Sequence, residues 1–445
     1  MTYIDRFENV SILGAAGKMG SGILLLTAVE MADLKLKPEN RDKPFILNAI
    51  DVSPAGLSGL YGYLKAQVTK IAEKRIVELR GIYKDKPELI ENSEIIDRYV
   101  DDVLKLVLFS TRIESAYESG LIFEAIIEDS KIKIGIFSRI LENNKKNPWF
   151  LTNTSSVPIA ELDSGAGING NIIGFHFYNP PAVQKLVELI TTPKTNSELI
   201  EFSKTYAQKL NKKLVPSNDF AGFIGNGHFM RDLLYGIKTA EALKDKLSFV
   251  ESVFAINRIS QDFLIRPMGI FQLMDYVGVD VCQKILHVMR LRLKDDNLHS
   301  VLIDRLIDLG IKGGQNSDGS QKPGIFSYEK GKPVSVYDPD MKAYKNIESI
   351  KFSVDNYLDK VPGSHRQWKE IISDKDRNVF LSAYFKELKS LNTLGSKLAV
   401  DYFENSKKIG LDLIKNGIAD NGDHVNTVML TGFFHAYGPI NDFLD

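Results

Sequence analysis

Short apolar runs and helical spacings alternate along the first half of the chain. Apolar runs typical of buried strands occur at 9–14, 44–51, 104–109, 121–127 and 149–153. Apolar positions recur at helical spacing in three of the intervening segments, at 23–32, 56–84 and 130–142. This alternation predicts a doubly wound α/β sheet whose parallel strands are buried on both faces.

The pattern changes after about residue 215, and from Phe220 onward the spacing is largely helical. Residues 313–346 are rich in Gly, Ser, Asp, Asn and Pro, which predicts a long connecting segment with room for one short hairpin. Gly269-Ile-Phe-Gln-Leu-Met-Asp resembles Gly438-Pro-Ile-Asn-Asp-Phe-Leu, and each follows a helical stretch. We therefore predict an all-α region with two similar helical units. The predicted domains are 1–215, 216–312, 313–365 (the connecting segment) and 366–445.

Charge and composition narrow the class of protein. The 56 basic and 57 acidic side chains nearly cancel, so no charge excess favours nucleic acid or a membrane surface. The N-terminus lacks the pattern of a signal peptide, and no apolar run approaches membrane-spanning length. The single cysteine, Cys282, lies in an apolar helical context and is expected to be a small buried side chain rather than a nucleophile. We expect a cytoplasmic protein without nucleic-acid partner, membrane insertion or metal site.

A glycine-rich turn joins the first predicted strand to the first predicted helix. A dinucleotide needs glycine at such a turn, because a side chain would keep the pyrophosphate from the backbone N–H groups, and the helix N-terminus favours the negative charge. The alternative is a tight turn that binds nothing. The sequence favours a Rossmann-type nucleotide site, with Ala15 where the first glycine is expected, and with candidate cofactor contacts at Gly14, Gly17, Lys18, Met19 and Gly20.

Asp51 strengthens the prediction of a nucleotide site. It ends the second predicted strand, where a carboxylate accepts hydrogen bonds from the adenosine ribose hydroxyls. No arginine follows in Val-Ser-Pro-Ala to meet a 2′-phosphate, so NAD is preferred over NADP. The alternative for Asp51 is a strand-end turn residue.

Two predicted strands near residue 180 each carry one polar residue among apolar ones. These residues are His176 in Asn-Ile-Ile-Gly-Phe-His-Phe and Glu188 in Lys-Leu-Val-Glu-Leu-Ile. Burying one of these groups in its charged form without a partner costs on the order of several kcal/mol. We therefore expect the two groups to hydrogen-bond each other. A carboxylate on one imidazole nitrogen fixes the tautomer and makes the other nitrogen a better base. The pair is either the general base of an alcohol oxidation or a structural pair, and these two residues alone do not decide between them.

Ser155 and Asn226 are further candidates for binding a substrate oxygen. Ser155 lies in Asn153-Thr-Ser-Ser, after a predicted strand, at the carboxyl edge where ligands bind in open sheets. Asn226 begins the helical region. Taken singly, a capping serine and a polar helix position are the better interpretations.

Together these segments resemble the L-3-hydroxyacyl-CoA dehydrogenase family. The matching stretches, in family order, are Gly17-Lys-Met-Gly-Ser-Gly-Ile, Phe123-Glu-Ala-Ile-Ile-Glu-Asp, Asn153-Thr-Ser-Ser, Gly174-Phe-His-Phe-Tyr-Asn-Pro-Pro, Lys185-Leu-Val-Glu, Gly222-Phe-Ile-Gly-Asn and Arg266-Pro-Met-Gly-Ile-Phe-Gln-Leu-Met-Asp-Tyr-Val-Gly. The resemblance covers residues 8 to about 290 well and the remainder more loosely. The chain departs from the family at Ala15, at Ala221 in place of proline, and at Gly227 in place of arginine.

The resemblance implies a role for each matching residue. His176 would be the base and Glu188 its orienting partner, while Ser155 and Asn226 would bind the substrate's 3-oxygen. Glu128 and Lys133 match positions that line the cofactor site. Lys74 lies near a family CoA contact, although a solvated helix face explains it equally well.

The resemblance also implies an activity and an assembly. The expected activity is the NAD-dependent oxidation of (3S)-3-hydroxyacyl-CoA to 3-oxoacyl-CoA, as in fatty acid β-oxidation. Alternatives are the same fold acting on a sugar acid or a ring-derived hydroxyacyl-CoA, and a nucleotide-binding scaffold without turnover. Two helical units in one chain predict a monomer or weak dimer, which could associate with other β-oxidation enzymes.

Overall fold

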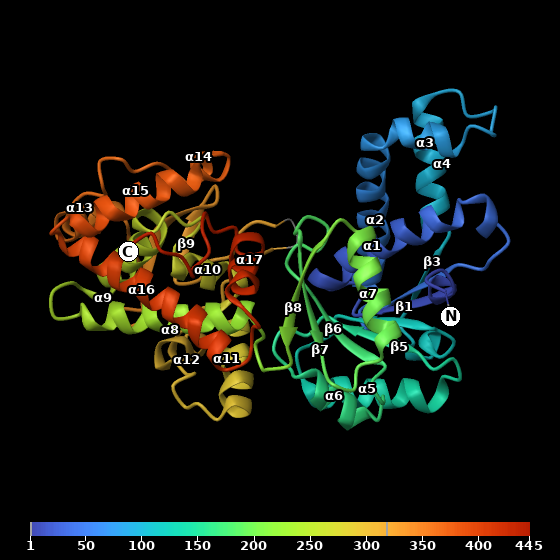
Figure 1. Cartoon of the computed structure of the whole chain (residues 1–445), viewed down its shortest axis with the longest axis horizontal. Coiled ribbons are helices and arrows are strands. Elements are labelled where there is room, and N and C mark those ends of the chain that lie inside the picture. Colours follow the sequence, from blue (N-terminus) through green and yellow to red (C-terminus); the bar gives the residue numbers. More distant parts are fainter. Residues whose placement is uncertain (1, 317–318) are drawn as a thin grey trace. The chain divides into compact units, whose positions relative to one another are not determined.

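The computed structural model describes residues 2–316 and 319–445, which form two compact units divided between Asp219 and Phe220. The first unit is built on an eight-stranded sheet covered by helices, and the second is largely helical (Figure 1). The predicted fold class, a Rossmann-type α/β domain followed by a mainly helical region, is confirmed.

The strands of the first unit lie close to where the apolar runs predicted them, except the last strand, which was not predicted. The strands are β1 (Asn9–Leu13), β2 (Ile46–Ile50), β3 (Val107–Ser110), β4 (Leu121–Glu124), β5 (Trp149–Thr152), β6 (Ile172–Phe177), β7 (Leu186–Thr191) and β8 (Lys213–Asn218). The helices are α1 (Lys18–Lys35), α2 (Pro54–Lys74), α3 (Ile76–Ile82), α4 (Asn92–Leu104), α5 (Ser130–Asn143), α6 (Ile159–Ala166) and α7 (Ser197–Lys209). The predicted helix 56–84 is divided at Arg75 into α2 and α3.

The strand order is β3-β2-β1-β4-β5-β6-β7-β8. The first six strands in this order run parallel, but β7 is antiparallel to β6, and β8 is parallel to β7. The sheet is therefore mixed rather than wholly parallel. The loop 178–185 between β6 and β7 explains this, because a connection so short cannot hold the crossover that a parallel pair needs.

Side chains alternate between the two faces of the sheet. Phe175, Phe177, Val187 and Leu189 belong to the core that includes residues of α1 and α7. The residues between them project to the other face, where α6 packs, since a Cβ added to Gly174 would contact Ile159 of that helix. His176 and Glu188 lie on this second face.

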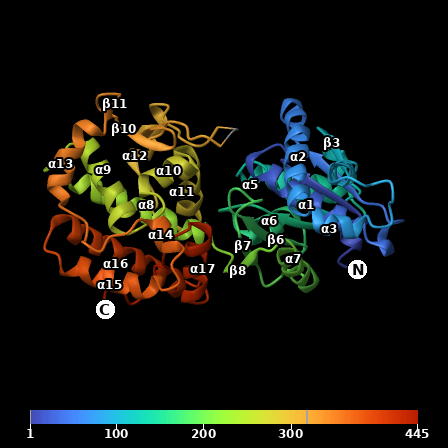
Figure 2. The same ribbon diagram turned by 90° about the horizontal axis from the view of Figure 1, so that it is seen from above.

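The second unit contains ten helices among its described residues. They are α8 (Gly225–Ala242), α9 (Phe249–Arg258), α10 (Ile270–Val277), α11 (Val279–Leu293), α12 (Val301–Asp308), α13 (Glu348–Leu358), α14 (Trp368–Ile372), α15 (Arg377–Ser390), α16 (Leu394–Lys415) and α17 (Gly422–Gly432). Helices α8 and α16 pack together and α15 lies beside α16 (Figure 2). One hydrophobic core extends from Ala221 to Leu444. Among the described residues, no helix combines the length and apolar character needed to cross a bilayer.

The segment 313–346 contains the short hairpin that was expected there, but a third strand extends it. The segment contains a three-stranded antiparallel sheet of β9 (Phe326–Glu329), β10 (Lys332–Asp338) and β11 (Ala343–Asn346). Buried Asp275 of α10 holds its first strand, because the carboxylate accepts from the N–H groups of Ile325 and Phe326 at 2.7 and 2.8 Å. The turn composition concealed short strands whose order comes from this contact with α10.

Two places in the second unit have the same local construction. Asn257 of α9 and Asn426 of α17 each lie twelve residues before a glycine, Gly269 and Gly438. In each case the amide oxygen accepts from backbone N–H groups just after the glycine, and a Cβ on the glycine would collide with the asparagine. The residues four positions before the glycines, 265 and 434, have φ of 50° and 56°. This shared geometry extends the sequence similarity noted between the two stretches.

Candidate active site

His176 and Glu188 face each other across the β6–β7 pair, in direct register. The imidazole Nδ1 lies 3.2 Å from the carboxylate Oε1. The His176 side chain is 9% exposed and that of Glu188 is fully buried. Because a carboxylate only accepts, Nδ1 carries the proton and Nε2 is left as the basic nitrogen. The structure thus brings together the two polar residues that interrupt the apolar strands.

Tyr178 adds a donor to this pair. Its hydroxyl donates to Glu188 Oε1 at 2.7 Å, the same oxygen that accepts from His176. The tyrosine and imidazole rings lie 4.8 Å apart, centroid to centroid, at a 41° tilt. Sequence reasoning missed Tyr178. The signal was its spacing, since a residue two positions after His176 in an extended chain projects to the same side.

Glu128 organises the loop that carries Ser155. Its Oε1 accepts from Thr154 Oγ1 at 2.7 Å, and from the N–H groups of Ser155 and Ser156 at 2.9 Å each. The Ser156 hydroxyl donates to the same oxygen at 2.9 Å. Burial opposes the charge of Glu128, but Lys133 and these donors outweigh it and hold the pKa of this carboxyl below its ordinary value.

Lys133 lies beneath this loop in a buried ion-pair cluster. Its ammonium is 2.6 Å from Glu124 Oε1 and 3.2 Å from Glu128 Oε2. The side chains of Lys133 and Glu124 are 1% and 0% exposed, whereas that of Glu128 is 20% exposed. Burial alone would lower the pKa of Lys133, but the two carboxylates raise it above its ordinary value. Sequence reasoning missed Glu124, although a carboxylate inside a buried apolar run was a signal for it.

The glycine turn is closed by contacts that only glycine permits. Gly14 has φ of 76°, and a Cβ there would lie 2.5 Å from the carbonyl oxygen of Ala125. A Cβ on Gly20 would overlap Gly14 itself. Helix α1 begins at Lys18 with Gly17 as its N-cap, so the N–H groups of its first turn point out of the helix beside this turn. The backbone therefore forms a cradle that a side chain would fill.

Asp51 follows β2 and lies against the same turn. Its Oδ2 accepts from Ala16 N and its Oδ1 from Ser53 N, both at 3.0 Å. Each carboxylate oxygen has a second lone pair, so these bonds leave acceptor capacity for a ligand hydroxyl. Asp51 thus shapes the turn as well as offering a charge beside it.

Comparison with known proteins gives a consistent relationship. The NAD binding domain of 3-hydroxyacyl-CoA dehydrogenase matches residues 9–220, and the C-terminal domain of that enzyme matches residues 236–322. A probable 3-hydroxybutyryl-CoA dehydrogenase of Deinococcus radiodurans is 31% identical over 242 residues, which cover 54% of this chain and 84% of the relative. The mitochondrial hydroxyacyl-coenzyme A dehydrogenase of Sus scrofa is 30% identical over 280 residues, 63% of this chain and 79% of the relative.

The chain belongs to the 3-hydroxyacyl-CoA dehydrogenase family. It is an NAD-dependent dehydrogenase. The crystal structure of 3-hydroxybutyryl-CoA dehydrogenase from Escherichia coli superposes with a TM-score of 0.62 at 19% sequence identity. That similarity in fold covers 97% of this chain and 90% of the other. The likeness in fold therefore extends beyond residue 322, where the match to the family domains ends.

The dehydrogenase has a cradle that fits NAD. The close approach of Gly14 to Ala125, and of Gly20 to Gly14, leaves backbone rather than side chains around the N-terminus of α1. Backbone N–H groups and the helix dipole there suit a pyrophosphate, and Asp51 suits the ribose hydroxyls. Of the residues predicted to bind the cofactor, Gly14 and Gly17 lie in this turn and Lys18, Met19 and Gly20 in the first turn of α1, and their contacts with the cofactor stay predictions.

Two predicted substrate contacts are placed but remain predictions. Lys74 is the last residue of α2 and is exposed, so its ammonium is accessible to solvent. Asn226 is the second residue of α8, in the second unit.

Cys282 is fully buried in α11, where burial raises the pKa of its thiol.

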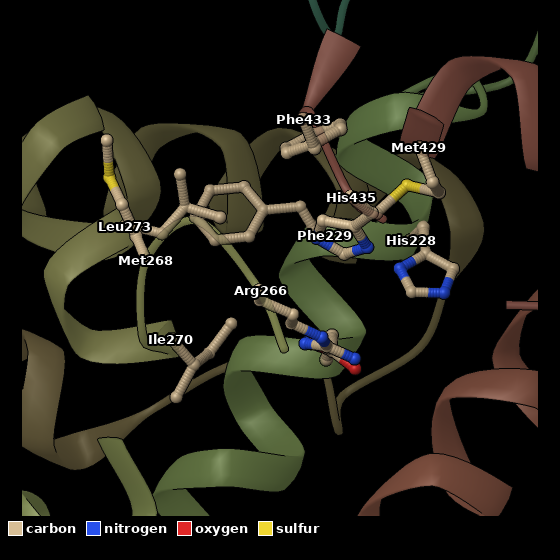
Figure 3. Close-up of a pocket in the computed structure, with 10 residues that line it drawn as sticks. His228, Phe229, Arg266, Met268, Ile270, Leu273, Met429, Phe433 and His435 are labelled. Carbon is tan, nitrogen blue, oxygen red and sulfur yellow. The ribbon is translucent and has the colours of Figure 1, made fainter. Parts of the chain in front are cut away.

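The dehydrogenase has another buried polar cluster, in its helical unit (Figure 3). Arg266 pairs with Asp232 at 2.7 Å, and His228 Nε2 lies 3.1 Å from the carbonyl oxygen of Ser406. Together with His435, these side chains border a cavity of about 10 Å³, room for one water molecule. Burial lowers the pKa of both histidines, and the charge of Arg266 adds to this effect. Both imidazoles are therefore kept neutral.

Proposed function

We propose that this dehydrogenase oxidises (3S)-3-hydroxyacyl-CoA thioesters to 3-oxoacyl-CoA, with His176 as the general base and Glu188 as its positioning partner. The observation that carries the proposal is the 3.2 Å contact between Nδ1 and a fully buried carboxylate. The relatives are named as dehydrogenases of 3-hydroxybutyryl-CoA and of hydroxyacyl-coenzyme A. These names support the substrate class.

The residues of the chain divide the work of alcohol oxidation. His176 Nε2 accepts the proton of the substrate 3-hydroxyl as the C3–O bond becomes a carbonyl. Bound NAD supplies the acceptor for the hydride that leaves C3. Glu188 stabilises the imidazolium that forms, and the hydroxyl of Ser155 and the amide of Asn226 hold the 3-oxygen. Glu128 keeps Ser155 in place through the N–H groups of its loop.

The pathway is part of the same proposal. We assign the reaction to fatty acid β-oxidation in the cytoplasm, with other enzymes of that pathway as possible associates. A sugar acid or a ring-derived hydroxyacyl-CoA is the alternative substrate. The third hypothesis is a scaffold that binds nucleotide without turnover. The contact between His176 and Glu188 argues against this hypothesis.

The decisive assay is the reverse reaction. Purified enzyme is mixed with NADH and acetoacetyl-CoA, or with a long-chain 3-oxoacyl-CoA, and the loss of NADH absorbance is followed. We expect turnover of at least one thioester, with NADPH clearly poorer. Turnover of a 3-oxo sugar acid alone would move the substrate to the alternative class, and NADH binding without any turnover would support the scaffold.

We also propose that the second unit contains two copies of one helical element and that the protein is a monomer or weak dimer. The repeated geometry of Asn257 with Gly269 and of Asn426 with Gly438 supports this. The second copy would cover, within one chain, an apolar face of the first copy that would otherwise need a partner subunit. Light scattering should show a monomer, and deleting 370–445 should cause association or aggregation. A tight dimer built on residues 220–290 would contradict the proposal.

A further inference from the structure

Glu188 receives two donors on one oxygen. Oε1 accepts from Tyr178 Oη at 2.7 Å and from His176 Nδ1 at 3.2 Å. The carboxylate is fully buried, so these contacts replace water as the stabilisers of its charge. A hydrogen bond to a charged group is worth about 1.5–3 kcal/mol, and the shorter of the two bonds here belongs to tyrosine.

The two donors compete for the same negative charge. A carboxylate that is bonded to a hydroxyl places less charge on an imidazole than one bonded to the imidazole alone. Tyr178 therefore weakens the support that Glu188 gives to a protonated His176, while it holds Glu188 in its ionised form. The base is thereby kept available at lower pH than an unshared pair would allow.

We propose that Tyr178 is a positioning residue of the dehydrogenase, which shares Glu188 with His176 and sets the lower limit of the pH range in which the base works. This rests on the proposed role of His176 as base. Tyr178 acts through Glu188 and is assigned no contact with substrate.

Tyr178 remains a donor across the working pH range. Burial, and then the charge of Glu188, raise the pKa of its hydroxyl well above the ordinary value. The ring also packs on the imidazole at 4.8 Å between centroids. Phenylalanine would keep the ring and remove only the hydroxyl, so the exchange separates hydrogen bonding from packing.

The other ionisable groups on the surrounding elements are unchanged by that exchange. They include Lys185 before β7, Lys213 of β8, Glu161 and Asp163 of α6, Asp219 after β8, and the cluster of Glu124, Glu128 and Lys133. Asp163 accepts from Gly170 N, and Asp219 accepts from Ile159 N and Ala160 N. A shift caused by Tyr178→Phe therefore reports on Glu188 and His176 rather than on these groups.

Tyr206→Phe is the matched control. Its hydroxyl is also buried and lies 2.9 Å from Thr27 Oγ1, in the core on the opposite face of the sheet from Glu188. Both exchanges remove one buried tyrosine hydrogen bond in the same unit, but only one of these bonds reaches Glu188. A general loss of stability would appear in both variants.

The first measurement is the pH profile of kcat/KM for the wild type and both variants. We expect the acid limb of the Tyr178→Phe profile to move up by about one pH unit, because the charge of Glu188 is then no longer shared with a hydroxyl. The Tyr206→Phe profile should keep the wild-type limb. An unmoved limb in an active Tyr178→Phe enzyme would overturn the proposal.

The second measurement needs no turnover. With ¹³C-labelled histidine, the ring signal of His176 is assigned by its absence in His176→Asn and titrated by NMR. The midpoint should rise in Tyr178→Phe and not in Tyr206→Phe, and an unmoved midpoint would refute the shared-carboxylate proposal even in an inactive protein. If the midpoint rises but no thioester is turned over, Tyr178 tunes the pair as proposed, and only the proposed function fails.

Discussion

The two units of the dehydrogenase each bury histidine near a carboxylate, with opposite outcomes. In the sheet unit, the carboxylate of Glu188 accepts a hydrogen bond directly from Nδ1 of His176. In the helical unit, Asp232 is paired with Arg266, and burial, to which the charge of Arg266 adds, lowers the pKa of the nearby His228 and His435. Residue type therefore does not define the role of a buried histidine. Its surroundings do, since a carboxylate in direct contact supports an imidazolium, whereas burial without such a contact opposes it.

The largest effect should come from breaking the ion pair of the helical cluster. Arg266→Met would leave Asp232, which is 4% exposed, without its cation, and this should cost about 3–5 kcal/mol. Thermal unfolding should show a lower Tm, and Arg266→Met with Asp232→Leu should recover much of the loss because no unpaired charge remains. If Arg266→Met instead cut kcat a hundredfold at unchanged Tm, the cluster would be catalytic and the contrast would fail.

Breaking the sheet pair should affect rate rather than stability. Glu188→Gln keeps the size of the side chain but removes the charge that supports the imidazolium, so kcat should fall by about 10²–10³ while KM moves little. His176→Ala should be at least as damaging, and the double variant scarcely worse than the worse single one. Steady-state kinetics with unfolding curves would test this. A Glu188→Gln protein that unfolds, beside a His176→Ala protein with near-normal turnover, would make the pair structural.

Much of this contrast could be read from the sequence, but only for one unit. The apolar runs located the strands of the sheet, and one polar residue inside each of two runs singled out His176 and Glu188. Side chains alternate between the two faces along each strand, and this places both residues on the same face of the sheet. The pair could therefore be anticipated. Glu124 also interrupts a predicted strand and was overlooked, whereas Tyr178 was missed because it lies just after its strand and does not interrupt it.

The helical cluster could not be predicted in this way. Its members come from α8, α16 and the segments after α9 and α17, and so are joined only by tertiary packing. A polar residue at one helix position reads as solvated until the packing of α8 on α16 is known. The three-stranded sheet at 326–346 was missed for a similar reason, since Asp275, far away in the chain, holds it in place. Local patterns predict elements, whereas these features depend on which elements meet.

A smaller effect should come from acid. Because burial lowers the pKa of His435 in the folded protein, the unfolded state binds its proton first, so stability is lost as the pH falls below about 6.5, the ordinary value. His435→Asn should remove this dependence. The measurement is the difference in the free energy of unfolding between wild type and His435→Asn. Asp275, whose pKa burial raises to about 7, has the opposite pH dependence to His435, but it contributes equally to both proteins and cancels in the difference. If the free energy of unfolding changes between pH 5 and 7 by the same amount in both proteins, to within about 0.5 kcal/mol, His435 is not kept neutral.

The smallest effect separates the two tasks of Asp51, which belongs to the sheet unit and has no counterpart in the helical cluster. Asp51→Ala removes a ribose acceptor, so KM for NAD should rise about tenfold, the equivalent of about 1.4 kcal/mol, while KM for the thioester changes little. It also removes the bonds to Ala16 N and Ser53 N, so a small loss of stability is expected.

Asp51→Asn sharpens the test, because its single amide oxygen can still accept from one of these N–H groups while the charge is gone. If Asp51→Asn keeps the wild-type Tm and still raises KM for NAD, the carboxylate binds the cofactor directly. If both variants lose stability together and neither changes KM, Asp51 is only a turn residue. The selectivity for NAD must then come from other parts of the cradle.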